Sequence, residues 1–124
     1  MNTLSGSWRL RHWYPSPDDD YEASTEYIMD AQQHGDTVVF TSRPYDRRTV
    51  YLIARLKIVG TLAVCSWYEI SRPDGPYGGR AYEGSGLVVI TPNGQLEGMW
   101  AGAGVDHQAG KPRIYTGRWE FEKI

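Results

Sequence analysis

Four of the five tryptophans in this 124-residue chain stand two positions after a small residue. The four segments are Gly6-Ser7-Trp8, Cys65-Ser66-Trp67, Gly98-Met99-Trp100 and Gly117-Arg118-Trp119. On a β-strand, positions i and i+2 face the same side, so each pair presents a gap and a large ring to one face. Alternating small and large inward residues fill the interior of a narrow β-barrel. The pattern therefore favours strands that close around a shared core.

Turn-forming residues divide the rest of the chain into strand-like segments. The 14 glycines and 7 prolines separate runs rich in Tyr, Trp, Val, Thr and Ile, and no window keeps a helical apolar spacing over three turns. Eight strands are predicted, at residues 6–14, 24–31, 37–42, 49–58, 61–70, 81–91, 95–104 and 113–122. Because most links are short, the prediction is all-β: an eight-stranded antiparallel up-and-down barrel in a single domain, residues 1–124.

Two hairpins differ in how firmly the sequence sets their register. Thr91-Pro92-Asn93-Gly94-Gln95 predicts a type I turn closed by a glycine bulge, which pairs Ile90 with Leu96 and Gly86 with Trp100.

The other hairpin leaves two registers open. A two-residue Val59-Gly60 turn pairs Leu52 with Trp67 and turns Arg55 outward, whereas a three-residue loop pairs Tyr51 with Trp67 and turns Arg55 inward. We favour Arg55 outside, because the alternate positions then form an aliphatic core face. That face is Val50, Leu52, Ala54, Leu56 and Ile58.

The inward faces are predicted to combine aromatic rings with a few polar groups. Trp8 and Trp119 are expected to plug the core, whereas Trp67 and Trp100 lie mid-strand and can border a cavity. An apolar cavity with a few convergent polar groups is typical of a small-molecule site. Residues 15–22 and 71–80 are expected to form its rim. The candidate ligand-binding residues are Tyr27, Trp67, Glu69, Tyr82, Trp100, Arg113 and Tyr115; His12 and Tyr14 are also expected inside.

Composition narrows the classes of partner. The net charge is −2 and no basic run exceeds Arg47-Arg48, so nucleic-acid binding is not expected. No apolar stretch approaches the roughly 20 residues of a membrane span, and the start lacks a signal-peptide pattern. With Cys65 as the single cysteine, the expected location is cytoplasmic.

The residue pattern gives little indication of a catalytic site, a cofactor site or a metal site. The three histidines, His12, His34 and His107, show no metal-ligand spacing. Cys65 is expected to face inward from mid-strand, as inert core cysteines do. The sequence therefore predicts no catalytic residue, no metal and no cofactor.

The Gly6-Ser7-Trp8 motif, the strand count and the closing Thr116-Gly117-Arg118-Trp119 strand resemble the calycins, which include lipocalins, fatty-acid-binding proteins and avidins. In lipocalins an arginine near the C-terminus packs across the first-strand tryptophan, and the resemblance implies Arg118 or Arg113 for that role. Residues 100–104 followed by 113–119 also resemble small bacterial domains that serve as sensory or accessory modules. The resemblance implies a ligand-holding barrel.

The expected function is therefore non-catalytic binding or sensing of a flat or partly apolar small molecule. The alternative is a filled barrel with a structural or protein-interaction role, for example as an accessory module of a bacterial regulatory protein. The sequence does not decide whether the chain forms a homo-oligomer or is fused to a partner domain. Clustered outer aromatic residues would mark an interaction surface; the candidates are Trp13, Tyr21, Tyr45, Tyr68 and Tyr77.

Overall fold

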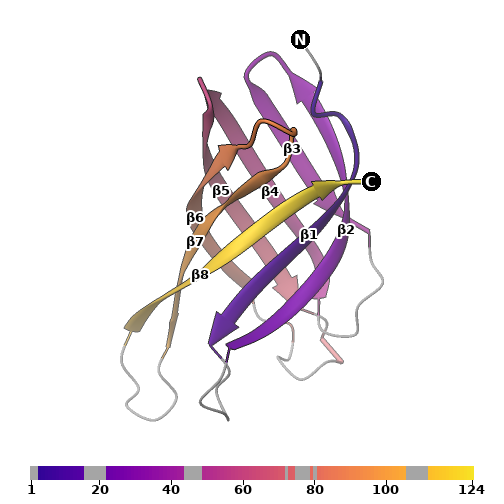
Figure 1. The fold of residues 1–124 in the computed structure, drawn as a ribbon. Helices are drawn as coiled ribbons and strands as arrows, with labels where there is room; N and C mark the ends of the chain where they lie inside the picture. The colour runs from indigo at the N-terminus through magenta and orange to yellow at the C-terminus, as the bar shows by residue number, and fades with distance from the viewer. Residues whose placement is uncertain are drawn as a thin grey trace.

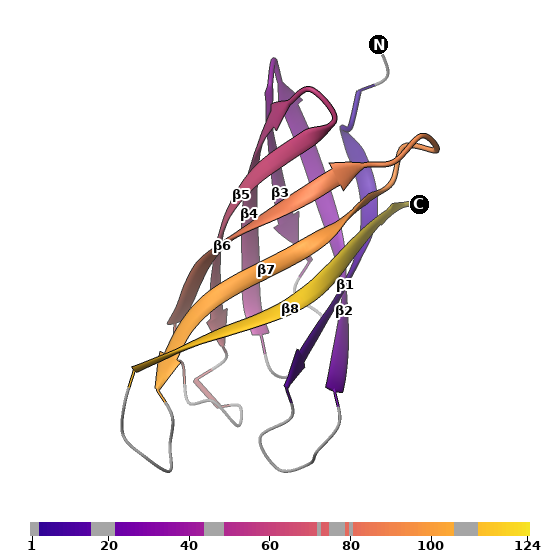
Figure 2. The same cartoon turned by 60° about the vertical axis from the view of Figure 1, so that its left-hand side comes forward.

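A computed structural model describes residues 3–15, 22–43, 49–71, 73–74, 79, 81–105 and 112–124, with backbone alone for residues 15, 22, 49, 50, 104, 105, 112 and 113. The strands are β1 (Gly6–Pro15), β2 (Glu22–His34), β3 (Thr37–Ser42), β4 (Thr49–Val59), β5 (Leu62–Ser71), β6 (Ala81–Ile90), β7 (Leu96–Val105) and β8 (Pro112–Lys123). Each strand pairs antiparallel with the next, and β8 pairs with β1, which closes the barrel (Figure 1, Figure 2). The predicted fold class is confirmed. Within these residues, no helix could span a membrane.

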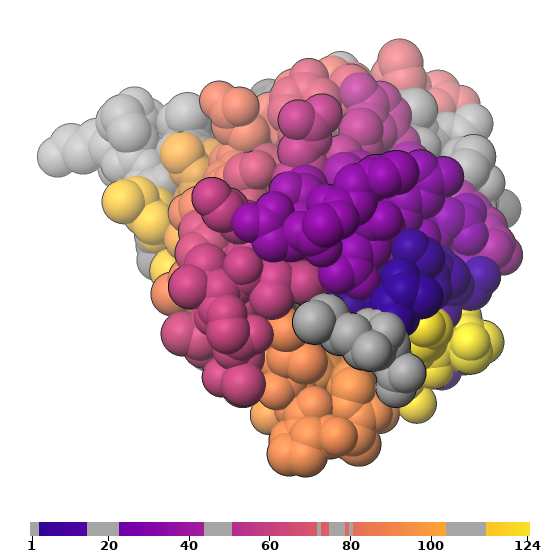
Figure 3. Space-filling view, turned by 90° about the horizontal axis from the view of Figure 1, so that it is seen from above, coloured from indigo at the N-terminus to yellow at the C-terminus, as the bar shows by residue number. Residues whose placement is uncertain are grey.

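The two ends of the barrel differ in their connections. At one end, tight turns join β2 to β3, β4 to β5 and β6 to β7, with Gly35, Gly60 and Gly94 at positive φ. We call this the hairpin end, and Figure 3 shows the three hairpins gathered over it. The strand ends that the other four links join lie at the opposite end, here the linker end. These links include the predicted rim segments, residues 15–22 and 71–80, most of which lie outside the described residues.

The fully buried core lies toward the hairpin end. Trp8 packs edge-on against Phe40 with ring centroids 5.5 Å apart, and Phe40 packs against Phe121 at 5.0 Å. Trp119 is 5.3 Å from Phe121, and both Trp8 and Trp119 are almost completely buried. The prediction that these two tryptophans plug the core is confirmed.

The two hairpin registers came out differently. The β6–β7 register is the predicted one, with Ile90 opposite Leu96 and Gly86 opposite Trp100. In the β4–β5 hairpin both predicted registers are wrong: the turn is Gly60-Thr61, with Gly60 at φ 66°, and Trp67 lies opposite Ala54.

The β4–β5 register is slid by two residues from the predicted two-residue turn. Because side chains alternate with a period of two, this slide changes no face. Arg55 is exposed as predicted, and Leu52, Ala54 and Leu56 are buried. The side chain of Val50 lies outside the described residues.

In the part of the barrel formed by strands β5 to β8, glycines lie directly beneath two indole rings. A methyl group at Gly84 or Gly102 would lie 2.6 Å or 2.7 Å from Cζ2 of Trp67, and one at Gly117 would lie 2.6 Å from Nε1 of Trp100. Trp67 lies opposite Gly84 in the ladder, and Trp100 lies opposite Gly117. Each of these two rings therefore occupies space left by a glycine on a neighbouring strand, in addition to the space left by the small residue two positions before the tryptophan.

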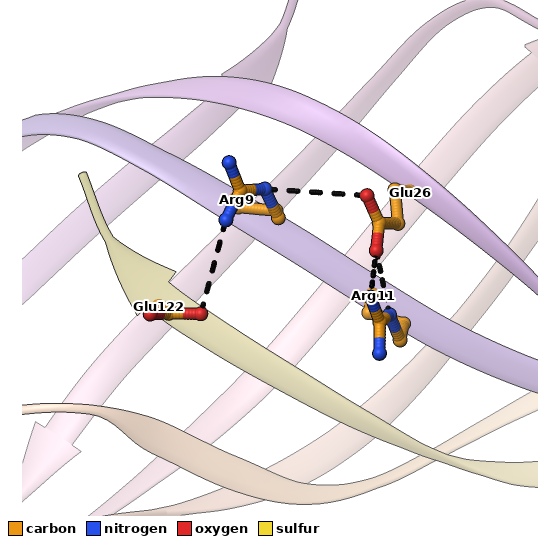
Figure 4. Close-up of polar contacts among 4 residues, drawn as sticks. All are labelled: Arg9, Arg11, Glu26 and Glu122. Atoms are coloured by element: carbon orange, nitrogen blue, oxygen red, sulfur yellow. Dashed lines mark hydrogen bonds and ion pairs between the residues drawn. The ribbon is translucent and has the colours of Figure 1, made fainter.

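The outer surface over β8, β1 and β2 carries charges that pair. Arg9 lies 4.0 Å from both Glu26 and Glu122, and Arg11 forms a hydrogen-bonded ion pair with Glu26 (Figure 4). Arg9 and Arg11 alternate along β1 with the buried Trp8 and Leu10.

The arginine expected over the first-strand tryptophan lies elsewhere. The guanidinium of Arg118 is 4.0 Å from the ring centroid of Trp13, on the outer face of β1. The buried Trp8 has the ammonium of Lys123 at 5.9 Å instead. The expectation of Arg118 over the buried first-strand tryptophan is therefore wrong, because its strand turns Arg118 outward. The side chain of the other candidate, Arg113, lies outside the described residues.

Candidate ligand site in the barrel interior

Several large inward side chains in the linker half of the barrel are only half-buried. Along β5, Ala63 and Cys65 are buried, Trp67 and Glu69 are half-buried, and Ser71 at the end of the strand is buried again. In a closed barrel, a side chain that points inward can be reached by solvent only through an end. The half-buried inward side chains of this region are His12, Tyr14, Thr25, Trp67, Glu69, Tyr82, Trp100 and Tyr115.

A polar cluster spans the interior at this end. The Tyr27 hydroxyl donates to Oε2 of Glu69 at 3.5 Å, which joins β2 to β5 across the barrel. His12 of β1 stacks on Tyr27 with ring centroids 5.3 Å apart, and its Nε2 lies 3.4 Å from the Tyr27 hydroxyl. Tyr82 stands opposite Glu69 in the β5–β6 ladder. A carboxylate, a phenol and an imidazole thus meet at one place.

Two tryptophans border this cluster. Trp67 and Trp100 meet edge to face with centroids 5.9 Å apart, and the His12 ring meets Trp100 at 6.3 Å. The indole N–H of Trp67 donates to the carbonyl of Ser85 at 3.1 Å, and that of Trp100 donates to the carbonyl of Trp13 at 2.9 Å. Because both N–H groups are bonded to backbone, these side chains would meet a ligand through ring carbon.

Six of the seven predicted site residues face this part of the interior. Tyr115 stands opposite Gly102, the glycine beneath Trp67, so it lies at the level of that ring. Arg113 stands opposite Gly104 in β8, but its side chain lies outside the described residues. The other five are Tyr27, Trp67, Glu69, Tyr82 and Trp100.

The candidate site also includes His12, which the sequence placed inside but not among the ligand-binding residues. The β1–β2 register sets His12 opposite Thr25, so its diagonal neighbour on the same face is Tyr27. The chain between β1 and β2, residues 16–21, carries no turn signature that would predict this register. Alternation along β1 therefore predicted that His12 faces inward, but not that Tyr27 is its neighbour.

The buried polar groups of the described residues are paired, and these residues hold no metal-ligand cluster. No buried side-chain nitrogen or oxygen there lacks a hydrogen-bond partner, and no three His, Cys, Asp or Glu side chains gather as a metal site requires. Burial raises the pKa of the Cys65 thiol to about 12, so this cysteine is not a thiolate nucleophile near neutral pH.

The fold and these contacts define an up-and-down β-barrel whose interior is closed by aromatic and aliphatic packing at the hairpin end. At the linker end, solvent reaches inward-facing aromatic and polar groups. Comparisons with protein-family models, with curated proteins and with solved structures gave no match for this chain.

Proposed function

We propose that this chain is a non-catalytic barrel that binds or senses a small molecule at the linker end of its interior. The observation that carries the proposal is the group of half-buried aromatic and polar side chains that face inward at that end, among them Trp67, Glu69 and Tyr82. Clefts that combine accessible aromatic surface with a few convergent polar groups are the usual form of a small-molecule site.

The residues present favour a flat, partly apolar ligand that carries a hydrogen-bond donor. Trp67 and Trp100 offer ring carbon in a fixed edge-to-face arrangement, which suits a flat partner. Glu69, already in contact with the Tyr27 hydroxyl, retains acceptor capacity because a carboxylate has about four lone-pair sites. Tyr82 beside it adds a hydroxyl.

A relation to the calycins is part of this proposal. It is supported by the buried Trp8 of the Gly6-Ser7-Trp8 motif in β1 and by the closure of β8 onto β1. The role of a bacterial sensory or accessory domain and a cytoplasmic location also belong to the proposal. Neither a nucleic acid nor a membrane is proposed as a partner.

Native mass spectrometry of the protein purified from a cell extract tests this function. The wild type is expected to retain a non-covalent mass. Glu69→Gln and Tyr82→Phe each weaken ligand binding by roughly 1 to 3 kcal/mol where they leave a polar ligand atom unpaired, with little loss of stability. Glu83→Gln and Tyr68→Phe are the matched controls: they make the same changes on the exposed outer faces of β6 and β5 and leave the retained mass unchanged.

The alternative, a filled barrel with a structural or protein-interaction role, predicts the opposite result. No mass is retained, no small molecule raises the melting temperature, and Glu69→Gln and Tyr82→Phe both lower it. That combination refutes ligand binding. Equal loss of the retained mass from the interior variants and from their outer controls would refute the location of the site.

A further inference from the structure

The outer face of β5, β6 and β7 carries an apolar patch. Its side chains are between 45% exposed, at Val89, and 57% exposed, at Leu87 and Val59. We call it the outer apolar patch; its members are Val59, Leu62, Val64, Leu87, Val89 and Met99.

The strand registers make the outer apolar patch continuous. Leu62 stands between Val59 and Val89 in one row, and Leu87 stands between Val64 and Met99 in the next. Figure 2 shows β5, β6 and β7 side by side, the strands that carry most of this face. By contrast, the outer face of β8, β1 and β2 carries the paired charges of Figure 4.

Opposite charges flank the patch. Lys57 on β4 stands opposite Val64, and Glu97 on β7 stands opposite Val89. Both are exposed, and neither forms an ion pair within the residues that the structure describes. A surface with a cation at one border and an anion at the other can pair with a copy of itself.

We propose that the outer apolar patch is the interface of a homodimer, formed around a two-fold axis that runs along the strands between β5 and β6. This axis sets β5 of one protomer over β6 of its partner. Leu62 then meets the partner's Val89 and Val64 meets the partner's Leu87, apolar against apolar. Lys57 faces the partner's Met99. The partner's Glu97 is one row away, which the long side chain of Lys57 can reach.

The size of the surface agrees with a dimer. Six side chains exposed to this degree present roughly 500 Å² of apolar surface, near the top of the range of about 300–600 Å² for the largest patch on a typical monomer. Ser66 and Ser85, which continue the same outer face, and the two flanking charges extend it toward the roughly 800 Å² that each partner buries in a stable complex. An interface with an apolar centre and a charged rim is typical of stable complexes.

Sedimentation equilibrium over a concentration series from micromolar to submillimolar tests the proposal. The wild type is expected to reach twice the 14.1 kDa of one chain. Leu87→Glu raises the dimer dissociation constant by roughly tenfold or more, because it places carboxylates in an apolar interface. Ile114→Glu is the matched control: Ile114 is 74% exposed on β8, outside the patch, and its change leaves the dimer intact. Circular dichroism checks that both variants remain folded.

A charge exchange tests the arrangement. Lys57→Glu and Glu97→Lys each weaken the dimer, and the double variant restores it, because residue 57 lies one row from residue 97 of the partner, within reach of its side chain. A wild type that stays monomeric throughout the series overturns the proposal and leaves the patch to a different partner. A dimer that survives Leu87→Glu, or that Ile114→Glu disrupts equally, also overturns it, as does a double charge exchange that restores nothing.

Discussion

The packing of Trp67 over Gly102 leads to a quantitative prediction about the wall of the candidate site. A methyl group at Gly102 would lie 2.7 Å from Cζ2 and 2.9 Å from Cη2 of Trp67, and its next neighbour, the Glu83 carbonyl oxygen, is at an ordinary 3.6 Å. Gly102 is not among the glycines at positive φ, so alanine strains no backbone there. The whole steric cost of Gly102→Ala therefore comes from one indole ring.

The magnitude follows from that geometry. In the wild-type background, Gly102→Ala overpacks the wall and lowers the free energy of unfolding by about 1–3 kcal/mol. In a Trp67→Ala background the obstacle is absent, and the same change is neutral or stabilises by up to about 1 kcal/mol through the lower entropy of the unfolded chain. The coupling between the two substitutions is therefore about 1–4 kcal/mol.

The coupling is measured with a double-mutant cycle: the wild type, Gly102→Ala, Trp67→Ala and the double variant are unfolded in urea. Unfolding is followed by far-ultraviolet circular dichroism, because fluorescence would change with the loss of a tryptophan. Gly84→Ala is the control: its methyl group would meet both Trp67 and the backbone carbonyl of Ala101, so much of its cost persists without the indole. Free energies for Gly102→Ala and Trp67→Ala that add within about 0.5 kcal/mol would refute the packing of Trp67 over Gly102.

Three further predictions concern the core. Trp119→Ala should lower the free energy of unfolding by about 3–5 kcal/mol in urea, because Trp119 is 3% exposed and packs on Phe121; a loss below about 1 kcal/mol would contradict its place in the core. Cys65 should react with a thiol reagent far more slowly in the native protein than in urea, and equal rates would contradict its burial. Because its folded pKa is about 12 and its ordinary value 9.0, the unfolded chain releases the proton first, and stability should fall as pH rises above about 9; in thermal melts Cys65→Ala should lack this part of the decline.

The sequence predicted most accurately where structure is local. The Thr91-Pro92-Asn93-Gly94-Gln95 turn predicted the register of β6–β7, because proline and glycine each require a particular backbone conformation there. Gly60 also marks a turn, but its neighbours carry no comparable signature, and the β4–β5 register differed from both predictions. The buried face of β4 was nevertheless correct, since it depends on alternation and not on register.

In the candidate site, too, the sequence predicted which way side chains face but not which side chains meet. Alternation along single strands placed Trp67, Glu69 and Tyr82 inside the barrel, and they share their faces with the buried Ala63, Cys65 and Val88. Alternation could not show that Glu69 meets Tyr27 across the interior, or that His12 stacks on Tyr27, because those contacts depend on how the barrel closes.

The sequence by itself therefore determined the strands and, for most of them, which side chains face inward, since both follow from chain-local geometry with a period of two. Tertiary structure alone decided which inward residues meet, and which of them solvent reaches. Trp8 and Trp67 both follow a small residue in similar motifs, yet one is buried and the other half-buried. Their difference depends on which side chains the closed barrel sets around each ring, and that is a property of all eight strands together.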